Sequence, residues 1–236
     1  MRYFLFFLMF PLNLMADGFH VPPATQAGAP AWLPLAASFR TTQCSLPCSE
    51  EKSASWQMRR DQGAIELRGT GSPFSEMWRR SGDGRIDYVF LMHDEKRSID
   101  YNPVDLKLAD KTPHWERLGS LIAAADLDRL EPGEHGQRFG YATRSYRGEL
   151  NGARVDVVWI PQLGLPASLQ TTRDAQRVSI ELLSIEATGT LPDAIAVPRD
   201  YQRVDYADLG DMEEDPQAQV WIRKAALAPG HQHHAH

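Results

Sequence analysis

The sequence predicts a mainly β fold with helices, of the α+β class, in which a strongly curved antiparallel sheet or incomplete barrel wraps one or two helices. Three observations predict it. From Ser55 onward, apolar and polar residues alternate with period two, and turn residues recur about every 10 residues. A helical pattern interrupts the strands near Pro113, and strand patterns resume after Pro132-Gly133.

The first group of strands forms a meander of neighbouring hairpins. Three turns separate these strands: Asp61-Gln62-Gly63, Gly82-Asp83-Gly84 and Asp94-Glu95, of which the first two carry glycine. The expected strands are Ser55–Arg60, Ala64–Gly69, Phe74–Ser81, Arg85–His93 and Lys96–Tyr101.

One strand of this meander is apolar on both faces. Alternate residues from Ile86 to Met92 face one side of the sheet, and Val89 and Leu91 face the other. A strand with two apolar faces is typical of a central position with cover on both sides. Other parts of the chain must therefore lie over the sheet.

A helical segment follows and is expected to supply that cover. Pro113 opens a helix with an apolar stripe through Trp115, Leu118, Leu121 and Ile122. Proline fits the first turn because its missing N–H has no partner there in any case. A second short helix is expected over Asp126–Leu130, before Pro132-Gly133.

Strands then return. Gln137–Leu150 and Arg154–Pro161 enclose Asn151-Gly152, a strong hairpin signal because both residue types tolerate positive φ. Two further strands, Ala167–Thr172 and Arg177–Thr188, follow the Leu163-Gly164-Leu165-Pro166 bend. A short terminal segment, Tyr201–Trp221, ends the expected domain.

This order of elements resembles the periplasmic lipoprotein carriers of the LolA/LolB-like superfamily. The residues that carry the resemblance are Ile86–Tyr101, the helix around Trp115, and Tyr146–Gly152 with Val157–Pro161 and the Leu163–Pro166 bend, within about residues 55–188. The resemblance implies a half-barrel whose apolar concave face holds acyl chains. No single functional residue is carried over, because no family signature aligns one to one with this chain.

The chain is expected to divide into four parts. Residues 1–16 form a signal peptide, since Arg2 precedes a short apolar run that ends at Ala16. Residues 17–50 form a Pro/Gly-rich leader with the cysteine pair, residues 51–222 the half-barrel, and residues 223–236 a flexible His-rich tail. The expected location is periplasmic or secreted, with no membrane span after signal cleavage.

The net charge and the two cysteines limit which partners and which cysteine chemistry are expected. A net charge of −6 without a basic run disfavours nucleic acid. The only two cysteines, Cys44 and Cys48, are expected to form a disulfide in an oxidising compartment. The alternative is a thiolate pair that binds metal.

The C-terminal tail supports the same metal alternative. His231, His233, His234 and His236 offer neutral imidazoles, which suit copper, nickel or zinc. A periplasmic metal-handling protein would use these residues together with the cysteine pair. Otherwise no cofactor is expected.

The sequence does not favour an enzyme. His93-Asp94-Glu95 offers acid–base groups, but it lies at a predicted hairpin tip, where polar residues are common.

The expected function is non-catalytic binding of a hydrophobic or amphipathic ligand, such as lipid or lipoprotein acyl chains. Trp78, Phe90, Met92 and Trp159 are the predicted lining residues. An envelope interaction scaffold, with a filled core and an exposed apolar patch, is the remaining alternative.

Overall fold

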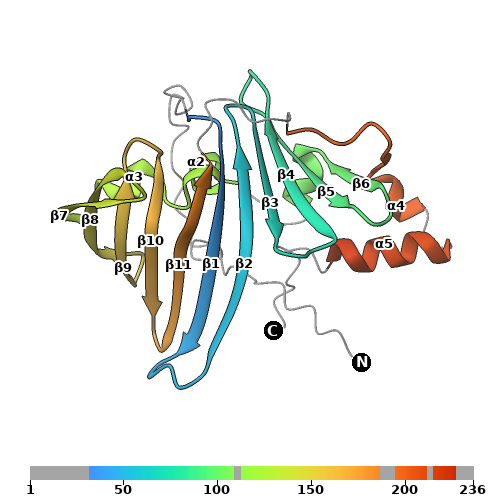
Figure 1. Ribbon diagram of the computed structural model, residues 1–236. Helices are drawn as coiled ribbons and strands as arrows, with labels where there is room; N and C mark the ends of the chain where they lie inside the picture. Colours follow the sequence, from blue (N-terminus) through green and yellow to red (C-terminus); the bar gives the residue numbers. More distant parts are fainter. Residues whose placement is uncertain (1–31, 109–112, 187–194, 212–214, 227–236) are drawn as a thin grey trace.

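The described residues of the computed structural model, 32–108, 113–186, 195–211 and 215–226, form one large curved sheet with short helices (Figure 1). The sheet has 12 strands in the order β12-β6-β5-β4-β3-β2-β1-β11-β10-β9-β8-β7. All neighbouring strands are antiparallel except β12, which runs parallel to β6. The predicted mainly β, α+β fold with a curved antiparallel sheet is confirmed.

The strands are β1 (Leu35–Ser45), β2 (Glu51–Arg60), β3 (Ala64–Gly69), β4 (Phe74–Arg80), β5 (Ile86–Met92), β6 (Arg97–Tyr101), β7 (Glu131–Arg138), β8 (Tyr141–Leu150), β9 (Ala153–Ile160), β10 (Leu165–Arg173), β11 (Gln176–Glu186) and β12 (Gln202–Asp205). The helices are α1 (Pro103–Leu108), α2 (Trp115–Ser120), α3 (Ala124–Leu127), α4 (Asp208–Asp211) and α5 (Pro216–Ala226). Among the described residues, no helix combines the length and apolar character needed to cross a membrane.

The strand predictions in both groups are largely confirmed. The meander appears as β2–β6, each strand within a few residues of its expected bounds. The Asn151-Gly152 turn joins β8 to β9, and both residues have positive φ, 50° and 75°. In these segments, the turn residues therefore determine where the strands end and pair.

The main correction concerns the expected leader over residues 17–50. Residues 35–45 form β1, which lies in the middle of the sheet between β2 and β11. Leu35, Ala37, Phe39 and Thr41 alternate toward the core, but two of these are small or polar and give a weak apolar pattern. The partner strand β11 lies more than a hundred residues later, so local sequence could not indicate the pairing.

The expected long strand over residues 137–150 was wrong. It is divided by a turn at Phe139-Gly140, whose φ angles are 53° and 80°. Phenylalanine rarely adopts positive φ and so gives no turn signal. β7 begins at Glu131 and includes Pro132, which an edge strand tolerates because its outer N–H groups have no ladder partner.

The helices differ from expectation in length and number. α2 ends at Ser120, because Leu121 adopts a left-handed conformation with φ 63°. α1 was not predicted, although Asn102 caps it by accepting hydrogen bonds from the Val104 and Asp105 backbone N–H groups at 2.8 and 3.1 Å. The apolar stripe of the predicted helix does face the core, with Trp115 and Ile122 buried.

Two apolar clusters lie on opposite faces of the sheet, as the two-faced β5 predicted. The larger cluster fills the concave face and includes Tyr88, Phe90 and Met92 of β5. The smaller one contains Val89 and Leu91, which are covered by a segment that includes Ile195. The prediction of cover on both faces of β5 is confirmed.

Candidate functional site

The concave face of the sheet carries one continuous row of apolar side chains. Strand register places Phe39 opposite both Trp56 and Leu182, so neighbouring strands turn like residues to the same side. Across the next strands, Ile65 lies opposite Trp78, and Trp78 opposite Tyr88. This face is the part of the molecule with the greatest capacity for a hydrophobic ligand.

Among the described residues, one cationic side chain on this apolar face is fully buried. Arg60, at the end of β2, lies opposite Leu35 and Ile65 and is 0% exposed. No ion pair among the described residues includes it. Burial lowers the pKa of Arg60 to about 9, so the guanidinium is still charged at neutral pH.

Within the described residues, every hydrogen bond of the Arg60 guanidinium goes to a backbone carbonyl. Its Nη1 donates to the carbonyl oxygens of Gly119 and, at 3.2 Å, of Gly164, and its Nη2 donates to that of Leu163. Gly119 belongs to α2, and the other two form the turn between β9 and β10. Arg60 therefore holds α2 and this turn onto the sheet.

Trp32 packs over the same junction. Its ring lies 5.0 Å from the Arg60 guanidinium carbon and stacks on Trp115 with 5.8 Å between ring centroids. A β carbon at Gly119 would overlap the Trp32 ring, so the close approach of α2 requires glycine there. We call Arg60, Trp32, Gly119, Leu163 and Gly164 the latch.

A cavity of about 220 Å³ lies beside the latch. Trp32, Leu163 and Gly164 line it together with residues of α2, of α3, of the segment between these helices and of the end of β9, among them Trp159 and Ile122. It is smaller than the roughly 300–1,000 Å³ that ligand sites usually have. A larger hollow of about 820 Å³ lies over β8–β11, where Val157, Leu169 and Ile180 of the same apolar cluster line it.

The four predicted lining residues have different surroundings. Trp159 is half-buried and lines the cavity. Trp78, Phe90 and Met92 are at most 7% exposed and belong to the filled core. Trp78 packs on Tyr88 at 4.5 Å between ring centroids. Contact between a ligand and these three residues stays a prediction and requires an open state.

Sequence reasoning missed Arg60 as a site residue, whereas Trp32 was among the apolar residues expected to dock the leader on the domain. A signal for Arg60 was present, because Trp56, Met58 and Arg60 alternate and a cation at the inward position of such a strand is unusual.

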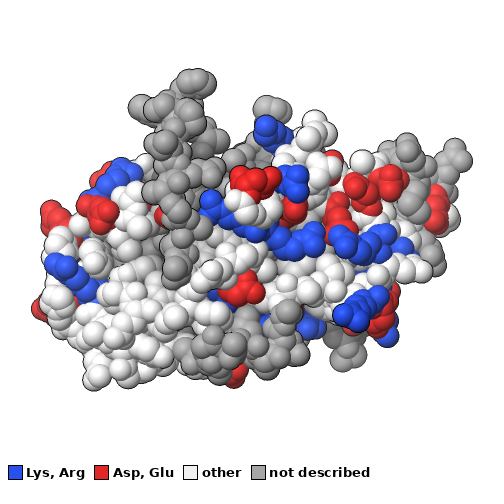
Figure 2. Space-filling model, turned by 90° about the horizontal axis from the view of Figure 1, so that it is seen from above, with Lys and Arg blue, Asp and Glu red and all other residues white. Residues whose placement is uncertain are grey.

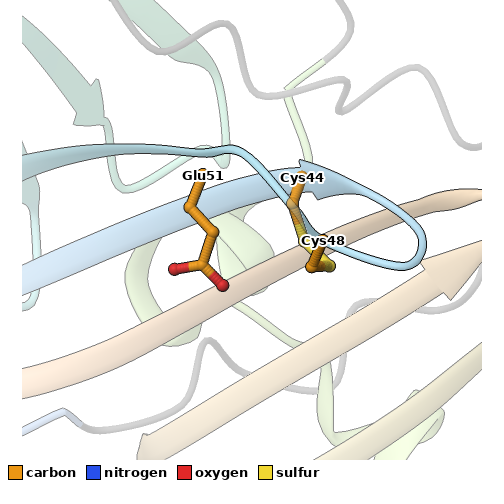
Figure 3. Close-up of side chains that lie close together, drawn as sticks. All are labelled: Cys44, Cys48 and Glu51. Atoms are coloured by element: carbon orange, nitrogen blue, oxygen red, sulfur yellow. A yellow bond between two sulfur atoms is a disulfide. The ribbon is translucent and has the colours of Figure 1, made fainter.

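The predicted disulfide is present at the tip of the β1–β2 hairpin (Figure 3). The Cys44 and Cys48 sulfurs lie 2.00 Å apart, with 5.1 Å between Cα atoms. Glu51 pairs with Cys44 in the strand register, and its carboxylate lies within 4.8 Å of the sulfurs. The predicted metal ligands His231, His233, His234 and His236 lie outside the described residues.

Removing the disulfide is expected to cost little. The loop that it closes is short, so the Cys44→Ser/Cys48→Ser variant should lose about 2 kcal/mol of stability at most. Urea unfolding of the variant and the wild type checks this value. The disulfide is not one of the latch residues, so its removal should leave ligand binding unchanged. Loss of ligand binding in the variant would contradict this expectation.

A polar network on the opposite face involves His93. Its Nε2 lies 3.0 Å from the Ser75 hydroxyl and its Nδ1 2.8 Å from the Tyr201 hydroxyl. Ser75 donates its proton to Glu66 at 3.0 Å, so His93 must donate from Nε2 and accept at Nδ1. In a nucleophilic serine site the histidine instead accepts the serine proton. This network fastens residues 195–201 to the sheet.

The His93 network predicts a loss of stability in acid. Burial, followed by the charge of Arg68, lowers the pKa of His93 from its ordinary value of 6.5. The unfolded chain therefore binds the proton at a higher pH than the native state, and this stabilisation falls as the pH drops below about 6.5. Urea unfolding at pH 7.5 and 5 should show a smaller decrease for His93→Gln than for the wild type. An equal decrease in both proteins would contradict the role of His93.

Comparison with known proteins gives matches in structure only. No protein-family model and no curated protein matches the chain. PNGF-II is 10% identical with a TM-score of 0.41, and the match covers 77% of this chain but spans only about a third (33%) of the PNGF-II chain.

Two smaller proteins match over most of their own length. A DUF1329 family protein from Desulfovibrio piger is 7% identical with a TM-score of 0.37, covering 70% of this chain and 90% of that one. The LolA superfamily protein NE2245 from Nitrosomonas europaea is 11% identical with a TM-score of 0.32, covering 73% and 93%. A LolA superfamily protein is thus among the solved structures that this chain resembles.

Proposed function

We propose that the protein is an exported, non-catalytic carrier that binds a hydrophobic or amphipathic molecule, such as lipid or the acyl chains of a lipoprotein, on its concave face. The observation that carries the proposal is the latch. A buried cation that binds only backbone carbonyls is a costly way to hold a helix, because neutral partners offset little of its lost hydration. Such a contact fits a cover that opens.

The energies of opening and binding are comparable. Releasing α2 and the β9–β10 turn from Arg60 breaks three hydrogen bonds to a charged group, which contribute about 1.5–3 kcal/mol each, so it costs about 5–9 kcal/mol. Burial of one methylene group contributes about 0.8 kcal/mol. About 6–11 buried methylenes therefore offset the cost, and a longer acyl chain gives net affinity.

The proposed location is the periplasm or the outside of the cell. The apolar run after Arg2 supports export, and the Cys44–Cys48 disulfide is stable in an oxidising compartment.

Two experiments test the carrier. Native mass spectrometry of protein purified from its own host should show co-purifying lipid. The neutral dye 1-N-phenylnaphthylamine should gain fluorescence on titration with the delipidated protein and saturate at one or a few sites. The heat-denatured protein serves as the control. A dye signal equal to that in buffer, together with lipid-free protein in the mass spectrum, would contradict the proposal.

Metal handling is the second candidate, and one cluster favours it. When the disulfide is reduced, the Cys44 and Cys48 thiolates and the Glu51 carboxylate offer three ligands within 4.8 Å of one another. Titration of the reduced protein with copper(I) or zinc tests this function, with and without residues 231–236. Tight stoichiometric binding that disappears in Cys44→Ser supports it, and its absence contradicts it.

A further inference from the structure

We infer that Arg60 is the recognition group for the anionic headgroup, carboxylate or phosphate, of an amphipathic ligand whose apolar chain lies on the concave face. The inference rests on the proposed carrier function and names the class of ligand. It follows from the place of Arg60 in the sheet and from the partners of its guanidinium.

The first observation is the buried charge of Arg60. Arg60 is the one cationic side chain among the described residues that is fully buried. The carbonyls of Gly119, Leu163 and Gly164 carry partial negative charge only, and its Nε has no hydrogen-bond partner in the described part of the chain. The guanidinium therefore has both unneutralised charge and a free donor.

The second step is what happens when the latch opens. Movement of α2 or the β9–β10 turn removes the carbonyls and leaves the guanidinium without partners on an apolar surface. An unpaired charge in such surroundings is strongly unfavourable. A carboxylate or phosphate replaces the carbonyls with a two-point contact that matches the planar guanidinium.

The third observation is the position of Arg60 between the cavity and the apolar face. Trp32 and Gly164 touch both the Arg60 guanidinium and the cavity of about 220 Å³, so little separates the cation from open space. On the other side, Arg60 lies between Leu35 and Ile65 in the register, and the apolar face continues through Trp78 and Tyr88. A headgroup at Arg60 therefore has an apolar path for its chain.

On the face in Figure 2, a row of basic side chains crosses the surface with acidic side chains beside it. Exposed basic side chains also form ion pairs, as Arg203 does with Asp100 at 2.7 Å and Lys96 with Asp200 at 2.8 Å. The whole chain has a net charge of −6, which disfavours anion binding at the surface. Preference for an anionic amphiphile thus depends on Arg60.

The experiment compares headgroups on one chain. Oleate, oleyl alcohol and oleylamine compete with 1-N-phenylnaphthylamine for the wild-type protein, each below its aggregation concentration, and acetate and inorganic phosphate serve as free anions. Oleate should displace the dye at about tenfold lower concentration than the alcohol. The amine should be weakest, and the free anions should not displace the dye, because they lack the chain.

Two variants assign the preference to Arg60. Arg60→Met should bind oleyl alcohol at least as well as the wild type does and lose the preference for oleate. Arg60→Lys keeps the charge without the planar fork and should retain only part of the preference. Arg59→Met, whose side chain is on the opposite face and pairs with Glu66 at 3.0 Å, is the control and should behave as the wild type.

Each result decides one question. Equal displacement by oleate and oleyl alcohol overturns headgroup recognition and leaves the carrier function standing. A preference that survives in Arg60→Lys and Arg60→Met assigns it to another group and also overturns the inference. If Arg60→Met does not fold, the wild-type headgroup series and Arg60→Lys decide. No dye binding and no displacement by any ligand overturns the carrier function itself.

Discussion

Replacing Arg60 with methionine is expected to lower the free energy of unfolding by about 3 kcal/mol. Methionine fills a similar volume, so the loss comes from hydrogen bonding. The carbonyls of Gly119 and Leu163 lose charged donors, while relief of the buried charge offsets part of the cost. For a chain of this size, the melting temperature should fall by about 6–12 °C.

The loss should also be local. Hydrogen–deuterium exchange should increase in α2 and in residues 161–164, which the guanidinium holds, before it increases in β3–β5. Arg59→Met is the matched control, because Arg59 forms a partly exposed ion pair with Glu66 and should cost about 1 kcal/mol at most. Equal melting temperatures and exchange patterns for Arg60→Met and the wild type would show that Arg60 does not hold α2 and the β9–β10 turn onto the sheet.

Replacing Gly119 with alanine is expected to disturb the same junction from the other side. The new β carbon overlaps the Trp32 ring, which cannot move easily because it stacks on Trp115 and on the Arg60 guanidinium. Overpacking of this kind costs about 1–3 kcal/mol, and better helix propensity returns about 1 kcal/mol. The melting temperature should fall by up to about 8 °C, and tryptophan fluorescence should shift to the red as Trp32 gains solvent.

Two controls separate this clash from a general effect of alanine. Gly82→Ala places a β carbon in open space and should leave the melting temperature nearly unchanged. In a Trp32→Ala background, Gly119→Ala should cost little, because the overlapping ring is gone. Additive effects of the two substitutions would show that Gly119 and Trp32 do not interact as the structure indicates.

The two substitutions are expected to affect the dye in the same direction. Both weaken the cover over the concave face, so both should raise binding of 1-N-phenylnaphthylamine if the closed state limits access. Only Arg60→Met should also change the preference among headgroups, because Gly119→Ala leaves the cation in place. The combination thus distinguishes access to the site from recognition within it.

The sequence by itself determined the local elements of this protein. Period-two alternation and the Asn151-Gly152 turn predicted β2–β6 and the β8–β9 hairpin, and the two-faced pattern of β5 predicted cover on both sides. The cysteine spacing predicted the disulfide. In each case the deciding interaction lies within the segment or between neighbouring strands, so nearby residues carry the information.

The tertiary structure decided the elements that depend on distant partners. β1 is a strand because β11 pairs with it from far along the chain, and the turn at Phe139-Gly140 depends on a backbone conformation that phenylalanine rarely adopts. The latch is the strongest case. Arg60, Trp32 and Gly119 come from three separate segments, and their contact exists only where the curved sheet brings α2 and the β9–β10 turn over β2.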